Sequence, residues 1–207
     1  MTNDATTDAD LDRRHAEKMA KRKAARAKIL QTKTIEKGLL IVHTGLGKGK
    51  STAAFGLAMR CLGHGMKIGI VQYVKGAWTS GERVVFDRFP DLVRLAVMGE
   101  GFTWETQDRQ RDIAAARAAW AQTEAMLADP SLSLVLLDEL NIVLRYDYLD
   151  IGTVVAALTA RRPDLHVVVT GRHAKPELID AADLVTDMTM VKHPFRSGVK
   201  AQRGIEF

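Results

Sequence analysis

Residues 43–52 read HTGLGKGKST, and they lie between the apolar run 38–42 and a mostly apolar segment that begins at Ala53. A strand, a glycine-rich turn and a helix in this order form the setting in which a phosphate-binding loop occurs. Residues 49–51, Gly-Lys-Ser, fit the end of the pattern G-x-x-x-x-G-K-[ST], whereas Thr44 stands where the first glycine is expected. The stretch therefore predicts a phosphate loop whose first glycine is displaced.

The chemistry of such a loop follows from its residue types. Three glycines can take backbone angles that let successive N–H groups surround phosphate oxygens: Gly45, Gly47 and Gly49. The loop leads into a helix N-terminus, whose unpaired amides and dipole favour an anion. Lys50 would reach the phosphates, and the Ser51 hydroxyl would ligate Mg²⁺. Lys48 adds a second positive charge, and Thr52 adds a further hydroxyl donor. The alternative is a glycine-rich turn with chance lysines.

A polyphosphate site of this kind needs acids for its metal ion, and residues 134–139 supply them. Four apolar residues run directly into Asp138 and Glu139. If the strand stays extended, these two side chains point to opposite faces, so one should face the metal more directly. The other would then hold a neighbouring loop or a water molecule. The alternative is that both are ordinary acids at a strand end.

The rest of the chain alternates short β-rich runs with helical stretches. Strands are predicted at 38–44, 67–74, 93–98, 132–140, 166–170 and 185–191, and helices at 50–62, 106–127, 151–160 and 176–184. This order indicates an α/β fold with three layers, in which helices cover both faces of a doubly wound, mostly parallel sheet. Together with the phosphate loop, this order predicts the fold of a P-loop NTPase of the RecA-like type.

Charge separates residues 1–37 from the folded domain predicted at 38–207. The chain has a net charge of +5, and residues 1–37 carry ten basic and six acidic residues, or +4. Residues 12–30 favour a helix because they are rich in Ala, Lys and Arg and contain no Gly or Pro. This N-terminal arm could be a solvated or disordered helix, a lid over an anionic ligand, or an arm for nucleic acid.

Composition also excludes several classes of protein. No run approaches the roughly 20 apolar residues that cross a bilayer, and residues 1–8 lack the features of a secretory signal. Cys61 is the only cysteine, so no intrachain disulfide can form. We therefore expect a cytoplasmic protein with no membrane partner.

Several sequence blocks together resemble one family. They are GLGKGKSTAAFG (45–56), GFTWET (101–106), LDEL (137–140), YDYL (146–149), TGR (170–172), VKHPF (191–195) and GVKAQRGI (198–205). In this order they are similar to the P-loop ATP:cob(I)alamin, or corrinoid, adenosyltransferases. The resemblance extends from about residue 38 to the C-terminus, and the combination is far more specific than any single motif.

The resemblance implies an unusual reaction for a phosphate loop. In this family the cobalt of a reduced corrinoid attacks the 5′ carbon of ATP, and the whole triphosphate leaves. The nucleotide lies reversed relative to other P-loop enzymes, and Thr44 at the first position of the motif is compatible with that. Mg²⁺ or Mn²⁺ would be held by Ser51, Glu139 and Asp138. The ATP-binding residues implied are Thr44, Gly45, Leu46, Gly47, Lys48, Gly49, Lys50, Ser51, Thr52 and Arg172.

The corrinoid side of the site also follows from the resemblance. Phe102 and Trp104 match aromatic residues that take the place of the lower axial ligand, which leaves a four-coordinate cobalt that accepts an electron more easily. Trp78 is a further candidate for the corrinoid pocket. Together with Lys50, Phe102 and Trp104 are the residues expected to carry catalysis.

The same resemblance implies binding partners, and two other functions remain as alternatives. The resemblance implies a homodimer in which the arm covers the partner's active site, and an electron-donating flavoprotein reductase. One rival function is a RecA-like ATPase whose arm binds nucleic acid, and another is a small-molecule kinase. The folded domain carries a net charge of only +1, so we expect no nucleic-acid partner.

Overall fold

The computed structural model describes residues 7–74, 81–97 and 108–206. The predicted corrinoid residues Trp78, Phe102 and Trp104 lie outside these ranges. The chain divides into two compact units, Met1–Glu36 and Lys37–Phe207.

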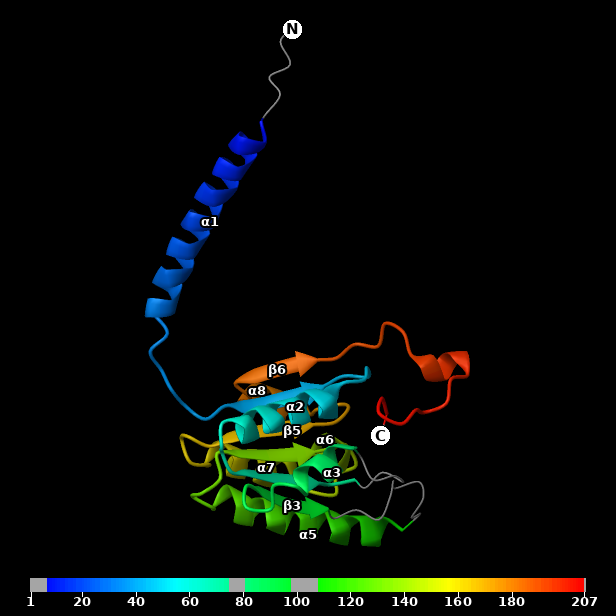
Figure 1. Ribbon diagram of the computed structural model, residues 1–207. Helices are drawn as coiled ribbons and strands as arrows, with labels where there is room; N and C mark the ends of the chain where they lie inside the picture. Colours follow the sequence, from blue (N-terminus) through cyan, green and yellow to red (C-terminus); the bar gives the residue numbers. More distant parts are fainter. Residues whose placement is uncertain (1–6, 75–80, 98–107, 207) are drawn as a thin grey trace. The chain divides into compact units, whose positions relative to one another are not determined.

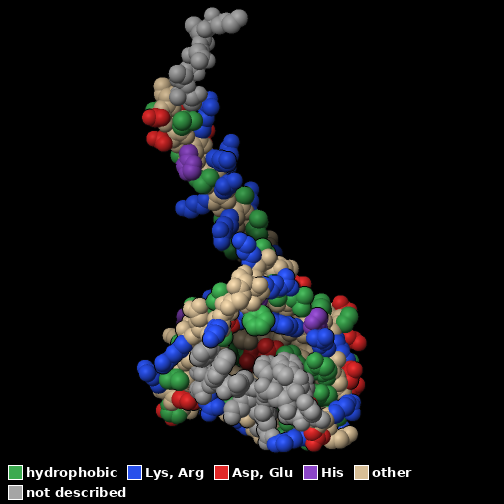
Figure 2. Space-filling view, turned by 90° about the vertical axis from the view of Figure 1, so that its right-hand side faces the viewer, with side chains coloured by type: hydrophobic (Ala, Val, Ile, Leu, Met, Phe, Trp, Pro, Cys, Tyr) green, Lys and Arg blue, Asp and Glu red, His purple; other side chains and the backbone are tan. Residues whose placement is uncertain are grey.

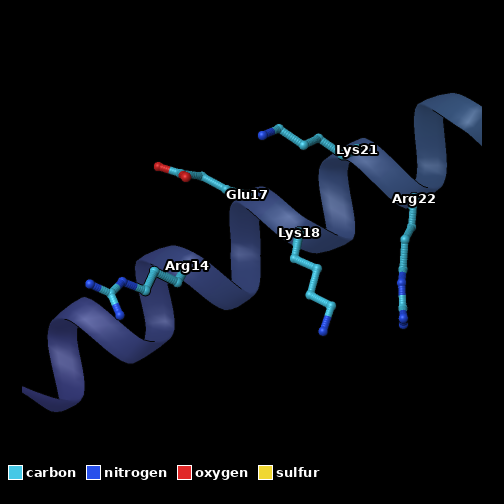
Figure 3. A pocket seen from close by; sticks show the side chains of 5 residues that line it. All are labelled: Arg14, Glu17, Lys18, Lys21 and Arg22. Carbon is cyan, nitrogen blue, oxygen red and sulfur yellow. The ribbon is translucent and has the colours of Figure 1, made fainter. Parts of the chain in front are cut away.

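The first unit contains one helix, α1 (Asp8–Gln31), in agreement with the helix predicted over 12–30. Thr7 caps it by accepting a hydrogen bond from the Asp10 N–H at 3.3 Å. None of its side chains is buried. Figure 3 shows the five side chains that line a shallow cavity along α1. Four of them are cationic, namely Arg14, Lys18, Lys21 and Arg22, and the fifth is Glu17. The helix therefore presents a mostly positive surface.

The second unit is built on a parallel sheet (Figure 1). Its described strands are β1 (Leu40–Thr44), β2 (Ile68–Gln72), β3 (Val93–Val97), β4 (Leu134–Asp138), β5 (His166–Thr170) and β6 (Leu184–Asp187). They lie in the order β3-β2-β4-β5-β1-β6, and every pairing is parallel. The predicted parallel sheet is confirmed.

Helices cover both faces of this sheet, because alternate strand residues face opposite ways. One face packs on α2 (Lys50–Gly63) and α3 (Gly81–Phe86), and its core includes Ile41, Phe55 and Leu136. The other packs on α5 (Arg109–Leu127), α6 (Leu140–Arg145), α7 (Ile151–Thr159) and α8 (Pro176–Ala181). The core of that second face includes Val42 and Trp120. The doubly wound, three-layer fold is therefore confirmed.

Three short elements were not predicted. They are α3, α6 and the 3₁₀ helix Pro194–Ser197, and each has only four or six residues, too few for helical periodicity to show. The strand predicted over 132–140 ends at Asp138, because Glu139 takes a left-handed φ of 61° and α6 begins at the next residue. The strand predicted over 185–191 is likewise shorter and ends at Asp187.

Parallel pairing brings the carboxyl ends of the strands to one edge of the sheet (Figure 1). Gln72 of β2 is in register with Asp138 of β4, and Thr44 of β1 is in register with Asp187 of β6. Ligands of doubly wound sheets bind at this edge. In the described part of the chain, no helix is both long and apolar enough to cross a membrane.

Candidate active site

The phosphate loop, residues 45–49, connects the carboxyl end of β1 to the first turn of α2 (Figure 1). Gly45 and Gly49 have φ angles of 98° and 106°, a region of backbone space that other residues rarely enter. Gly49 is also the N-cap of α2, and it offers no side-chain oxygen to the first amides of the helix. These N–H groups are therefore suited to an anion, which the helix dipole favours.

The segment that follows β6 packs directly against this loop. The N–H of Gly47 donates to the carbonyl oxygen of Met188 at 2.6 Å, and the N–H of Met188 donates to that of Thr44 at 2.9 Å. A Cβ atom at Gly47 would lie 2.6 Å from the oxygens of Met188 and Thr189. The glycines thus allow the backbone to bend and also allow a second chain segment to approach it closely.

This close approach predicts that Gly45→Ala lowers the free energy of unfolding by roughly 2–4 kcal/mol, as measured by urea denaturation. The new Cβ would meet the Asp187 Oδ1 at 2.2 Å and the Met188 oxygen at 2.5 Å, at a φ of 98°. Gly63→Ala is the matched control, because no atom lies within 4 Å of a Cβ there. The control should lose no stability, and wild-type stability of Gly45→Ala would contradict the packing described.

Lys50, the first residue of α2, is buried and turns back into the loop. Its Nζ donates to the carbonyl oxygens of Gly45 at 2.9 Å and Gly47 at 2.5 Å. Burial lowers the pKa of its ammonium group, and Glu139 opposes this shift, whereas Arg172 and Lys48 add to it. The ammonium is thus held by neutral carbonyl groups, which a phosphate oxygen can replace as a partner.

Asp138, the last residue of β4, is buried and surrounded by hydrogen-bond donors. The Thr170 hydroxyl donates to its Oδ1 at 2.7 Å, and the Gln72 amide donates to its Oδ2 at 3.4 Å. Ser51 on α2 is a further hydrogen-bonding partner. Burial nevertheless raises the pKa of the Asp138 carboxyl, which the three partners lower. The structure thus brings the predicted metal residues Ser51 and Asp138 together.

Glu139 differs from its neighbour because its Oε2 is buried and has no hydrogen-bond partner. Burial and the nearby Asp138 raise the pKa of the Glu139 carboxyl from 4.5 to about 7, although Lys50 and Arg172 lower it. We expected the two acids to point to opposite faces if the strand stays extended, and this condition is not met, because the strand ends at Asp138 and Glu139 is left-handed. The difference between them lies in their partners, because only Glu139 has an unpaired buried oxygen.

These residues fit a magnesium ion. Within the described ranges, no group of three or more His, Cys, Asp or Glu side chains could hold a metal. Mg²⁺ does not require such a group, since it usually takes one or two carboxylates and completes its shell with phosphates and water. Glu139 has an unpaired carboxylate oxygen, and the Ser51 hydroxyl is a hydrogen-bonding partner of Asp138, the adjacent acid in the chain; such oxygen donors are the kind that this ion prefers.

The remaining predicted ATP residues lie around the loop. Arg172 follows β5, and its charge lowers the pKa of both Lys50 and Glu139, so it lies near them. Lys48 is half-exposed and forms an ion pair with Glu206. Leu46 is half-exposed, and Thr52 is exposed on α2. The described part of the predicted set is therefore gathered at the carboxyl edge of the sheet.

A cleft of about 500 Å³ opens beside the loop. Leu46, Met190, Asp187 and Arg196 are among the residues that line it, so its wall is partly apolar and carries charges of both signs. In Figure 2, the face that carries the carboxyl edge is hollowed, and acidic side chains are visible inside the hollow. This edge thus has room for a ligand larger than phosphate.

Sequence reasoning missed residues that support the site. Thr170 and Gln72 both donate to Asp138, and the Nδ1–H of His43 donates to the Lys50 carbonyl oxygen at 3.2 Å. Asn141 is fully buried, and its amide donates to the carbonyl oxygen of Gly171 at 2.9 Å. A signal was available for Thr170 and Gln72, since both end strands at the edge where Asp138 ends β4.

A parallel sheet in this order, with a glycine loop leading into a helix and with the buried Asp138, followed by Glu139, two strands away, defines a P-loop nucleotide-binding protein. Residues 36–207 match the family described as ATP:corrinoid adenosyltransferase BtuR/CobO/CobP. Residues 2–30 match a second family description, Cob(I)alamin adenosyltransferase N terminal. The chain therefore belongs to the ATP:corrinoid adenosyltransferase family, as the sequence blocks predicted.

Relatives agree with this assignment. A corrinoid adenosyltransferase of Sinorhizobium sp is 57% identical over 198 residues, which cover 95% of this chain and 92% of the relative. That of Pseudomonas aeruginosa is 56% identical over 196 residues, 95% of this chain and 97% of the relative. Corrinoid adenosyltransferase CobA of Salmonella typhimurium is 49% identical over 172 residues, 83% of this chain and 87% of the relative.

Proposed function

We propose that this protein transfers the 5′-deoxyadenosyl group of ATP to the cobalt of a reduced corrinoid and releases triphosphate. The observation that carries the proposal is the identity of 49–57%, over most of the chain, to relatives named corrinoid adenosyltransferase. The rival function of a RecA-like ATPase with a nucleic-acid arm is not favoured, since the family match covers residues 36–207 and a second match covers 2–30.

The phosphate loop would stabilise the leaving group. A cobalt–carbon bond forms at the 5′ carbon as the carbon–oxygen bond breaks, and the electron pair of the broken bond goes to the triphosphate. Lys50 and the loop amides, with Lys48, would neutralise this developing charge, and preorganised donors of this kind supply much of an enzyme's rate enhancement. No proton is transferred, so the site requires no general base.

A magnesium or manganese ion would complete the set of positive groups around the triphosphate. Glu139 would ligate it through the oxygen that has no protein partner, together with the Ser51 hydroxyl, while Asp138 holds Ser51 in place. When bound, the ion supplies further positive charge to the triphosphate. The residues of this chain would orient the ion between the end of β4 and the first turn of α2.

The corrinoid side of the proposal rests on the family resemblance. Phe102 and Trp104 would occupy the lower axial position of the cobalt, and Trp78 would line the same pocket. An aromatic side chain there donates no electron pair to the metal, which eases reduction to Co(I). An electron-donating flavoprotein reductase would supply the electron in the cytoplasm.

The N-terminal arm would serve a homodimer. Its match to the family's N-terminal description supports a role in the same reaction, and its helix α1 buries no side chain within its own unit. Basic side chains such as Lys18, Lys21 and Arg22 suit a lid over a polyphosphate. We therefore propose that the arm covers the active site of the partner subunit.

One assay tests the function. The protein is incubated with ATP, Mg²⁺ and chemically reduced cob(I)alamin, and the products are separated by chromatography. We expect light-sensitive adenosylcobalamin and free triphosphate in equal amounts. ADP as the nucleotide product, with no adenosylcobalamin, would instead identify a kinase or an ATPase.

A further inference from the structure

The hydroxyl of Thr170, the last residue of β5, links both acids at the end of β4. It accepts a hydrogen bond from the Glu139 N–H at 2.9 Å and donates one to the Asp138 Oδ1 at 2.7 Å. Thr170 is fully buried. One side chain from the neighbouring strand therefore touches the backbone of one acid and the carboxylate of the other.

The direction of this hydrogen-bond chain is set by its two ends. A backbone N–H can only donate, so the Thr170 oxygen must accept from Glu139, and its single proton remains for Asp138. Valine has nearly the shape of threonine but removes both bonds, whereas serine keeps both. The chain thus depends on the hydroxyl group alone.

Glu139 needs such a restraint because its backbone is in an uncommon conformation. Its φ of 61° is left-handed, a region that costs a residue other than glycine free energy and persists only where surrounding structure imposes it. Gly171, directly after Thr170, packs closely, since a Cβ there would lie 3.0 Å from the Glu139 Oε2. The end of β5 therefore fits against the turn that carries Glu139.

We propose that Thr170 is a positioning residue for the metal ion: its hydroxyl holds Glu139 in the left-handed turn and at the same time orients Asp138, which holds Ser51. The inference rests on the proposed function, because that function makes Glu139 and Ser51 metal ligands. Thr170 touches no substrate and acts through its two neighbours. Loss of an outer partner of this kind typically weakens metal affinity about 10–100-fold.

The test measures Mn²⁺ binding to the full chain with ATP and without corrinoid, so that no turnover occurs. Electron paramagnetic resonance reports the free ion. We expect Thr170→Val to weaken Mn²⁺ affinity about tenfold or more, and Thr170→Ser to stay within about threefold of the wild type. Wild-type affinity in Thr170→Val would overturn the inference. If Thr170→Val does not fold, Thr170→Ala is used in its place, and wild-type Mn²⁺ affinity in that variant would likewise overturn the inference.

A matched control separates positioning from general destabilisation. Thr123 is also fully buried, and its hydroxyl bonds to the Tyr73 hydroxyl at 2.6 Å and the Ala119 carbonyl oxygen at 3.2 Å, in the core. Thr123→Val should lower the melting temperature as much as Thr170→Val but leave Mn²⁺ affinity unchanged. Equal weakening of affinity in both variants would overturn a specific role for Thr170.

A further variant distinguishes this inference from the proposed function. Glu139→Gln should weaken Mn²⁺ affinity at least as much as Thr170→Val. If Glu139→Gln binds the ion as the wild type does, the metal role of Glu139 fails, and the positioning role fails with it. If Glu139→Gln binds Mn²⁺ weakly and Thr170→Val binds it as the wild type does, only the positioning role fails.

Discussion

Lys50→Ala is expected to lower kcat/KM for adenosyl transfer about 10²–10³-fold or more. The ammonium of Lys50 is already inside the loop and hydrogen-bonded to the Gly45 and Gly47 carbonyl oxygens, so little rearrangement is needed when it meets the triphosphate. Its removal takes away positive charge where the leaving group becomes more negative. Adenosylcobalamin formation from pre-reduced cob(I)alamin measures the loss without the reduction step.

The control for this variant is Lys67→Ala, because Lys67 is exposed and precedes β2 at the opposite edge of the sheet. Its activity should stay within about twofold of the wild type, as is usual for surface substitutions away from a site. Both variants should bind corrinoid equally. Turnover of Lys50→Ala at the rate of the control would show that the loop does not stabilise the leaving group.

Glu139→Gln should have opposite effects on activity and on stability. The folded protein holds the proton of Glu139 more tightly than the unfolded chain, because its pKa is raised from 4.5 to about 7. Ionisation of this carboxyl therefore favours unfolding. The resulting loss of wild-type stability is complete above pH 7, on the order of 2–3 kcal/mol, and absent below pH 4.5. Glutamine keeps the shape and removes this penalty.

We therefore expect Glu139→Gln, without metal or nucleotide, to have a larger free energy of unfolding than the wild type at pH 8. At pH 5 this difference in free energy of unfolding should be less than half as large. Urea denaturation of both proteins at both pH values measures this difference. Adenosyl transfer by the variant should fall, since it loses a metal-binding oxygen. Glu177→Gln, an exposed substitution in α8, should change neither property. A stability difference between Glu139→Gln and the wild type that does not depend on pH would contradict the burial of this charge.

Local patterns in the sequence predicted the parts of the site that lie on single segments. The loop between β1 and α2 was found because its glycines, Lys50 and Ser51 are consecutive. Asp138 and Glu139 were found because they end an apolar run. The family blocks then predicted the reaction, which a phosphate loop and two acids do not determine.

Other parts of the site depend on contacts between distant segments. Thr170 reaches Asp138 only because β4 and β5 are neighbours, and no local pattern in the sequence states that neighbourhood. The packing of Met188 on Gly47 likewise requires β6 to lie beside β1. The left-handed turn at Glu139 was missed because glutamate has no preference for it.

The order of the strands also affects when the protein can begin to work. The strand β1, which carries the phosphate loop, lies between β5 and β6, the last two strands of the chain (Figure 1). During synthesis residues 43–52 leave the ribosome before residues 166–187. The strand β1 therefore has no paired strand on either side until β5 and β6 have been made. A nascent chain therefore has its lysine and glycines long before it can hold a nucleotide, and ATP can stabilise only a nearly finished polypeptide.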